Sequence, residues 1–204
     1  MAAKSNLTNM VLVLGLTCLL CSAVLAGAYA LTKNPIDKAA TEKTERAIAE
    51  VLPHFTAVEY NADGHYYTAR DGERVIGYAV ESTTVGFGGN LSLIVGVTAD
   101  GVVYNTSVLS HAETPGLGAK CTTDPKFTGQ WKGFDPSIKK LSVKKDGGDV
   151  DAITASTITS RAYTQAVANA VRVFEQIAGQ AGNDNDVIPS EASVSQMNGG
   201  PDDE

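Results

Sequence analysis

The stretch Leu91–Leu109, LSLIVGVTADGVVYNTSVL, decides the predicted fold of this chain of 204 residues. It holds two apolar runs with strand character, Leu91–Thr98 and Val102–Leu109, separated by Ala99-Asp-Gly101. Because an Asp-Gly pair tolerates the positive φ of tight turns, the two runs are predicted to form a β-hairpin. Three shorter runs precede the hairpin and extend it into an antiparallel meander: Ala57–Tyr60, Tyr66–Ala69 and Arg74–Ser82.

A second strong pattern, Thr157–Ala178, predicts an amphipathic helix. Apolar residues recur there at spacings of three and four, while Arg161 and Arg172 lie on the polar face. Gly179 is expected to end this helix. Together with the meander, the helix predicts an α+β fold, in which an antiparallel sheet has helices packed on it.

The N-terminal segment Val11–Leu31 has no charge in 21 residues. At about 1.5 Å per residue, a helix of this length crosses a hydrocarbon core of roughly 30 Å. The alternative is a cleaved signal peptide, because Ala28-Tyr-Ala30 has the form of a cleavage site. We favour a retained anchor, since the run is longer than the usual apolar part of a signal peptide. Flanking charges nearly balance, so they do not fix the orientation.

Further along the chain, Asp37–Leu52 predicts a helix that stops at Pro53, and the last residues are polar and rich in Gly, Asn, Asp and Ser. Five parts are therefore predicted, in chain order: a flank at residues 1–9, a transmembrane helix at 10–31, a helical connector at 32–53, a folded domain at 54–179 and a disordered acidic tail at 180–204.

The formal net charge is −7 and no basic domain is present. Nucleic acid is therefore not an expected partner, because phosphate binding needs a clustered positive face. One basic run is predicted to be the solvated face of a strand: Lys139, Lys140, Lys144 and Lys145.

Cysteine and histidine exclude further classes of site. Cys18 and Cys21 lie in the apolar segment, which leaves Cys121 as the only thiol of the folded part, so no intradomain disulfide is expected. None of the three His is spaced with Cys as in a zinc or haem motif, so no metal is expected.

Two segments carry chemistry. The block Asp151–Ser160 brings five hydroxyl residues to the start of the predicted helix, where free N–H groups and the helix dipole favour an anion. An ordinary Ser or Thr N-cap is the alternative. The loop His111–Ala119 contains Thr-Pro-Gly-Leu-Gly, which permits a flat ligand to approach the backbone closely, although ordinary turns have the same composition. Gly86-Phe-Gly-Gly89 adds a third such turn.

Taken together, these three segments resemble the G subunit of the Rnf ion-translocating electron transport complex. The chain is also similar to the C subunit of the sodium-pumping NADH:quinone reductase. The family's attachment pattern is an Asp, then Ile or Val, a hydroxyl residue, two small residues and the modified Thr. Here the pattern is Asp151, Ile153, Thr154, Ala155, Ser156 and Thr157, with Ala-Ser in place of the usual Gly-Ala.

The resemblance implies an FMN-binding domain at residues 54–179 that carries FMN through a phosphoester on Thr157. A separate flavin transferase would move the FMN moiety from FAD onto this hydroxyl. The protein would be an electron-transfer subunit of a ferredoxin:NAD-type translocase, with no catalytic residues of its own and with the other complex subunits as partners. It would be a single-pass protein of the cell inner membrane, with its FMN domain on the extracytoplasmic side.

The residues implied to bind the cofactor fall into two groups. Around the phosphate and ribityl chain lie Thr157, Thr154, Ser156, Ile158, Thr159 and Ser160; around the ring lie Glu113, Thr114, Gly116 and Leu117. Local capping is an equally good account of Thr154, Thr159 and Ser160. For His111 and Trp131 we favour a structural role and core packing over flavin contact.

Two other functions are compatible with the same sequence. One is an anchored flavin-binding or interaction module that takes no part in redox transfer. The other is a flavoprotein subunit of a different membrane reductase.

Overall fold

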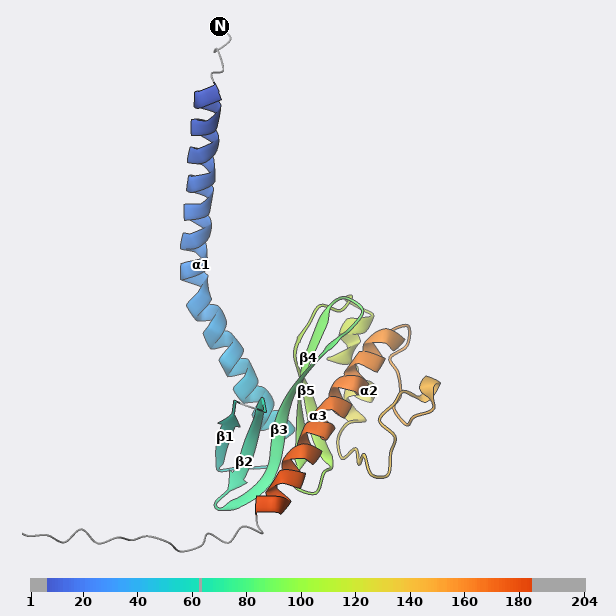
Figure 1. Ribbon diagram of the computed structural model, residues 1–204. Helices are drawn as coiled ribbons and strands as arrows, with labels where there is room; N and C mark the ends of the chain where they lie inside the picture. Colours follow the sequence, from blue (N-terminus) through green and yellow to red (C-terminus); the bar gives the residue numbers. More distant parts are fainter. Residues whose placement is uncertain (1–6, 63, 185–204) are drawn as a thin grey trace, which may run out of the picture.

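The computed structural model describes residues 7–62 and 64–184. A long N-terminal helix leads into an α+β domain, in which helices lie against a twisted sheet (Figure 1). The helices are α1 (Leu7–Val51), α2 (Pro125–Gly129) and α3 (Thr157–Asp184), with short 3₁₀ turns η1 (Gly118–Cys121) and η2 (Lys144–Asp146). The strands are β1 (Ala57–Asn61), β2 (Tyr66–Asp71), β3 (Arg74–Val85), β4 (Asn90–Thr98) and β5 (Val103–His111).

The five strands form one antiparallel sheet in the order β1-β2-β3-β4-β5, which confirms the predicted meander. The hairpin between β4 and β5 closes where the N–H of Gly101 donates to the carbonyl oxygen of Thr98 at 2.9 Å. Gly101 has a φ of +84°, a conformation that Gly adopts without a steric cost. The Asp-Gly pair therefore acts as predicted.

Two apolar cores cover the two faces of the sheet, because side chains alternate along each strand. Leu91, Leu93 and Val95 of β4 point to the α3 side, and Ile94 points to the α1 side. On the α1 side, a Cβ on Gly96 would overlap the carbonyl oxygen of Val51, so only Gly permits the end of α1 to lie this close to β4.

Trp131 lies in the core on the α3 side. Its side chain is fully buried and stacks on Tyr163, with ring centroids 5.3 Å apart and planes inclined by 19°. The packing interpretation of Trp131 is confirmed.

The predicted transmembrane helix and helical connector are one continuous helix, α1. By length and composition α1 is apolar enough to cross a membrane, and none of its apolar window is buried in the protein. Only its last turns are buried, through Ala47, Ile48 and Val51. Pro35 lies inside the helix, where it removes a backbone hydrogen bond, and α1 changes direction in this region (Figure 1).

Two predictions about local structure are wrong. α3 continues to Asp184, because Gly179 does not adopt the positive φ of a helix C-cap. The rest of the predicted acidic tail, residues 185–204, lies outside the described residues. The basic run is not a strand: Lys144–Asp146 form η2, and the N–H of Lys144 donates back to the carbonyl oxygen of Val150 at 2.8 Å. The apolar alternation of Leu141 and Val143 therefore belongs to a tight turn.

Candidate functional site

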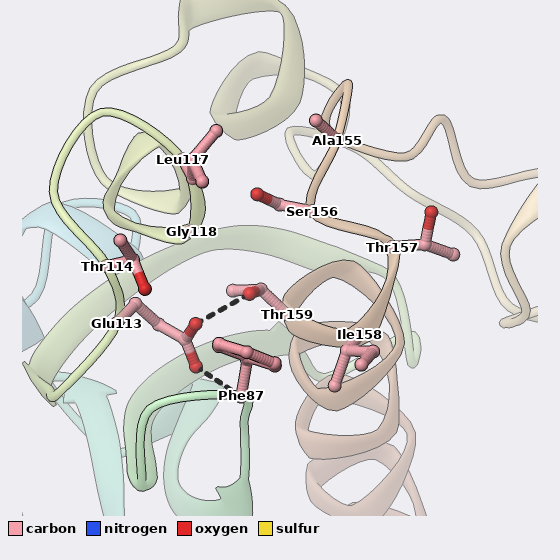
Figure 2. A pocket seen from close by; sticks show the side chains of 10 residues that line it. All are labelled: Phe87, Glu113, Thr114, Leu117, Gly118, Ala155, Ser156, Thr157, Ile158 and Thr159. Carbon is pink, nitrogen blue, oxygen red and sulfur yellow. Dashed lines mark hydrogen bonds between the residues drawn. The ribbon is translucent and has the colours of Figure 1, made fainter.

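The three sequence motifs meet in one cavity of about 350 Å³. The β3–β4 turn, the loop after β5 and the start of α3 form its walls (Figure 2). Its volume lies within the range of small-molecule sites. The lining residues are Phe87, Glu113, Thr114, Leu117, Gly118, Ala155, Ser156, Thr157, Ile158 and Thr159.

Glu113 joins the three walls. One carboxylate oxygen accepts a hydrogen bond from the N–H of Phe87 at 2.8 Å, and the other accepts one from Oγ1 of Thr159 at 2.7 Å (Figure 2). The first oxygen also accepts a longer hydrogen bond of 3.5 Å from the N–H of Gly88. Glu113 is only 5% exposed. The N–H of Glu113 donates to Nδ1 of His111 at 3.2 Å, which supports the structural interpretation of His111.

The glycines around Glu113 let these walls approach one another. A Cβ on Gly88 would overlap the carbonyl oxygen of Ala112, and a Cβ on Gly118 would overlap the Glu113 carboxylate. Gly116 differs, because a Cβ there would meet nothing and its φ of +75° is what favours Gly. Most of the glycine requirement therefore comes from packing between protein segments.

The segment Ala155–Thr157 lies at the rim of the cavity. Thr157 is the first residue of α3 and is half-buried, and its side chain points away from Glu113 (Figure 2). Ser156 is buried and its hydroxyl points into the cavity. Ala155 has a φ of +62°, a left-handed conformation that is unfavourable for a residue with a Cβ. The resemblance described above implies Gly at this position.

Of the predicted site residues, seven line the cavity: Glu113, Thr114, Leu117, Ser156, Thr157, Ile158 and Thr159. Three do not: Thr154, which is exposed, Gly116 and Ser160. The hydroxyl of Ser160 donates to the carbonyl oxygen of Ser156 and accepts from the N–H of Ile153, both at 2.9 Å. Ser160 therefore matches the local-cap alternative.

Three lining residues were not predicted from the sequence: Phe87, Gly118 and Ala155. All three lie within motifs identified in the sequence: Phe87 in the Gly86-Phe-Gly-Gly89 turn, Gly118 in the His111–Ala119 loop and Ala155 in the Asp151–Ser160 block. Lys145 of η2 was not predicted either, although its Nζ donates to Oγ1 of Thr157 at 3.2 Å.

The part of the chain that forms the cavity matches a known class of domain. Residues 86–172 match the family described as FMN-binding domain, and this range contains all three motifs.

Three relatives are named as G subunits of ion-translocating oxidoreductase complexes. The chain is 33% identical over 183 residues to the one of Methanosarcina acetivorans, a match that covers 84% of this chain and 96% of the relative. It is 35% identical over 176 residues to the G subunit of a proton-translocating ferredoxin:NAD(+) oxidoreductase complex of Clostridium ljungdahlii, covering 81% and 90%. The Erwinia tasmaniensis relative is 37% identical over 156 residues, covering 74% and 69%. The chain belongs to the family of G subunits of ion-translocating oxidoreductase complexes, as the resemblance predicted.

Among solved structures, the chain is similar to crystalline NqrC of Shewanella oneidensis, with 21% sequence identity and a TM-score of 0.47. The similarity covers 66% of this chain and 73% of that one.

Proposed function

We propose that this protein is the FMN-carrying electron-transfer subunit of a membrane ion-translocating oxidoreductase complex of the ferredoxin:NAD type. Its relatives are named as G subunits of such complexes, one of them explicitly of a ferredoxin:NAD(+) oxidoreductase. The observation that carries the proposal is the convergence of three separated motifs on one cavity at the start of α3. The other complex subunits are its partners.

The cavity suits a flat aromatic ligand. Three large apolar side chains on its rim remain substantially exposed: Phe87 at 68%, Ile158 at 51% and Leu117 at 44%. Covering them with the isoalloxazine ring would remove apolar surface from water, which is favourable at about 25 cal/mol per Å². Bound FMN supplies the redox chemistry, and the protein supplies position and electrostatics. Glu113 and Thr114 add polar groups on the same wall.

The attachment point of the cofactor is the hydroxyl of Thr157, esterified to the FMN phosphate by a flavin transferase that uses FAD. Thr157 opens a long helix, and the first turn of a helix has N–H groups without intrahelical acceptors. A phosphate on this residue gains from those donors and from the positive end of the helix dipole.

The domain is anchored by α1 as a single-pass protein of the cell inner membrane, with the FMN domain on the extracytoplasmic side. In Figure 1 the β3–β4 turn and the start of α3 lie at the side of the domain toward which α1 extends. With α1 in the membrane, the cavity would face the bilayer, which is where the partner subunits of a translocase lie.

The test compares intact masses of wild type, Thr157→Ala and Ser156→Ala, each produced with the transferase. Wild type and Ser156→Ala are expected to gain one FMN less one water, and Thr157→Ala is expected to gain nothing. Loss of the increment in Ser156→Ala alone would move the linkage to the hydroxyl inside the cavity. If Thr157→Ala loses FMN but the complex keeps its full electron flux, the protein is an anchored flavin-binding module without a redox role.

A further inference from the structure

The cation beside Thr157 comes from a distant part of the chain. Lys145 lies 12 positions before Thr157, and its Nζ donates to the threonine Oγ1 at 3.2 Å. The side chain of Lys145 is exposed, so its position depends on how η2 is held.

The turn that carries Lys145 is built into the domain. Gly147 has a φ of +77°, and a Cβ on Gly148 would overlap the carbonyl oxygen of Ser142, so the two glycines close the turn. On the α3 side, Asp146 accepts two hydrogen bonds of 2.7 Å from the guanidinium of Arg161. These bonds hold the pKa of the Asp146 carboxyl below its usual value.

A second ion pair anchors the other side of the turn. Nζ of Lys144 lies 2.8 Å from a carboxylate oxygen of Asp151, at the beginning of the attachment motif. Lys145 is therefore flanked by two residues whose charged groups are each tied to the segment that contains Thr157.

Of the three cations around Thr157, only two pair directly with a carboxylate. Lys144 and Arg161 each pair with a carboxylate, whereas Lys145 forms no ion pair with any carboxylate of the described residues. Its ammonium contacts a neutral hydroxyl at the N-terminus of α3, where the helix dipole is positive and repels a cation. Lys145 also attracts the neighbouring Asp146 carboxylate at longer range and helps to lower its pKa, but no carboxylate of the described residues contacts the ammonium directly, so the ammonium is free to pair with an anion at Thr157.

We propose that Lys145 is the positioning residue for the phosphate that becomes attached to Thr157. This inference rests on the proposed covalent linkage. In the transfer, a bond forms between Oγ1 of Thr157 and the FMN phosphorus of FAD, and the bond from that phosphorus to the oxygen shared by the two phosphates breaks. AMP leaves, and the hydroxyl proton passes to a base of the transferase or to water. Lys145 stays protonated, pairs with the incoming phosphate, and afterwards pairs with the phosphodiester.

The experiment uses the full-length apoprotein in detergent micelles, with purified flavin transferase and FAD, and follows FMN incorporation by intact mass. Lys145→Gln is expected to lower the initial rate about tenfold, in line with the loss of one charge-assisted hydrogen bond at an exposed site. Lys145→Arg restores the charge and is expected to stay within about threefold of wild type. Lys140→Gln is the matched control, since no ion pair of the Lys140 side chain is present among the described residues, and its rate is expected to be unchanged.

Thermal unfolding of the same apoproteins separates this role from a structural one. Removing a cation from the positive end of α3 is expected to leave the Tm of Lys145→Gln equal to that of wild type or raise it. A rate for Lys145→Gln equal to that of wild type, an equal loss in Lys145→Arg, or a lowered Tm that accounts for the slow rate would each overturn the proposal. A wild-type protein that gains no FMN on Thr157 would overturn the proposed linkage and this inference together.

Discussion

Replacing Ala155 by Gly is expected to stabilise the protein, although most Ala-to-Gly changes destabilise. Ala155 has a φ of +62°, and the left-handed conformation costs an ordinary residue roughly 1–2 kcal/mol. Its methyl group is exposed, so little packing is lost. Because Gly has more conformational freedom in the unfolded chain, this stabilisation is reduced by about 0.4–1 kcal/mol.

The net expectation for Ala155→Gly is a free energy of unfolding raised by roughly 0.5–1 kcal/mol. For a protein of this size, that corresponds to a Tm about 1–4 °C higher. Ala168→Gly, inside α3, is the matched control and is expected to lower stability by about 1 kcal/mol.

Urea unfolding can be followed by the fluorescence of Trp131, the single Trp of the chain and fully buried. The two variants should shift the urea midpoint in opposite directions. A lower midpoint for both would refute the reasoning, because it would mean that the backbone at Ala155 is not strained.

Two further predictions concern buried ionisable groups near the cavity. Glu113→Gln removes a negative charge from the cavity wall and one of the two short hydrogen bonds of this side chain. We expect the free energy of unfolding to fall by about 1–3 kcal/mol and the FMN midpoint potential, measured by spectroelectrochemical titration, to rise. The control Glu175→Gln, at an exposed position, should leave the stability and the potential unchanged. An unaltered potential would place the ring away from Glu113. Burial and the nearby Glu113 raise the pKa of the Cys121 thiol from 9.0 to about 11. Alkylation of Cys121 at pH 8 should therefore be about 100-fold slower than that of an exposed thiol, because the thiolate is the reactive form. The measurement uses a variant in which Cys18 and Cys21 are replaced by Ser. Because the folded protein binds the Cys121 proton more tightly than the unfolded chain does, the protonated thiol stabilises the fold below pH 9, and this stabilisation is lost as the pH rises toward 11. A free energy of unfolding that does not change between pH 9 and pH 11 would contradict this prediction.

The sequence was sufficient where a pattern is local and periodic. Alternation along β4 and the Asp-Gly pair before Gly101 define the central hairpin, and the spacing of apolar residues defines α3. The convergence of the Glu113 loop and the Thr157 segment followed from the motifs of the family. Their contact depends on long-range packing, which no local pattern contains.

Other features could not be predicted because they depend on tertiary context. Gly is common at the C-terminal ends of helices, but the residues after Gly179 continue α3 to Asp184. Lys145 belongs to an ordinary run of lysines, and only the closed turn at Gly147 and Gly148 brings it to Thr157. The strain at Ala155 is a backbone angle, which composition does not reveal.

The continuity of α1 has a consequence for how the cavity is aimed. The 16 residues from 36 to 51, after the bend at Pro35, are helical throughout, and the last of them pack against the sheet, so this part spans about 24 Å as a stiff rod. A helix turns by about 100° per residue, so one added residue would raise the domain by only about 1.5 Å yet swing it by more than a quarter of a circle. A change in the length of this helix therefore alters the rotation of the domain about the helix axis much more than its distance from the membrane. Only insertions that complete whole helical turns would preserve the direction in which the cavity faces the partner subunits.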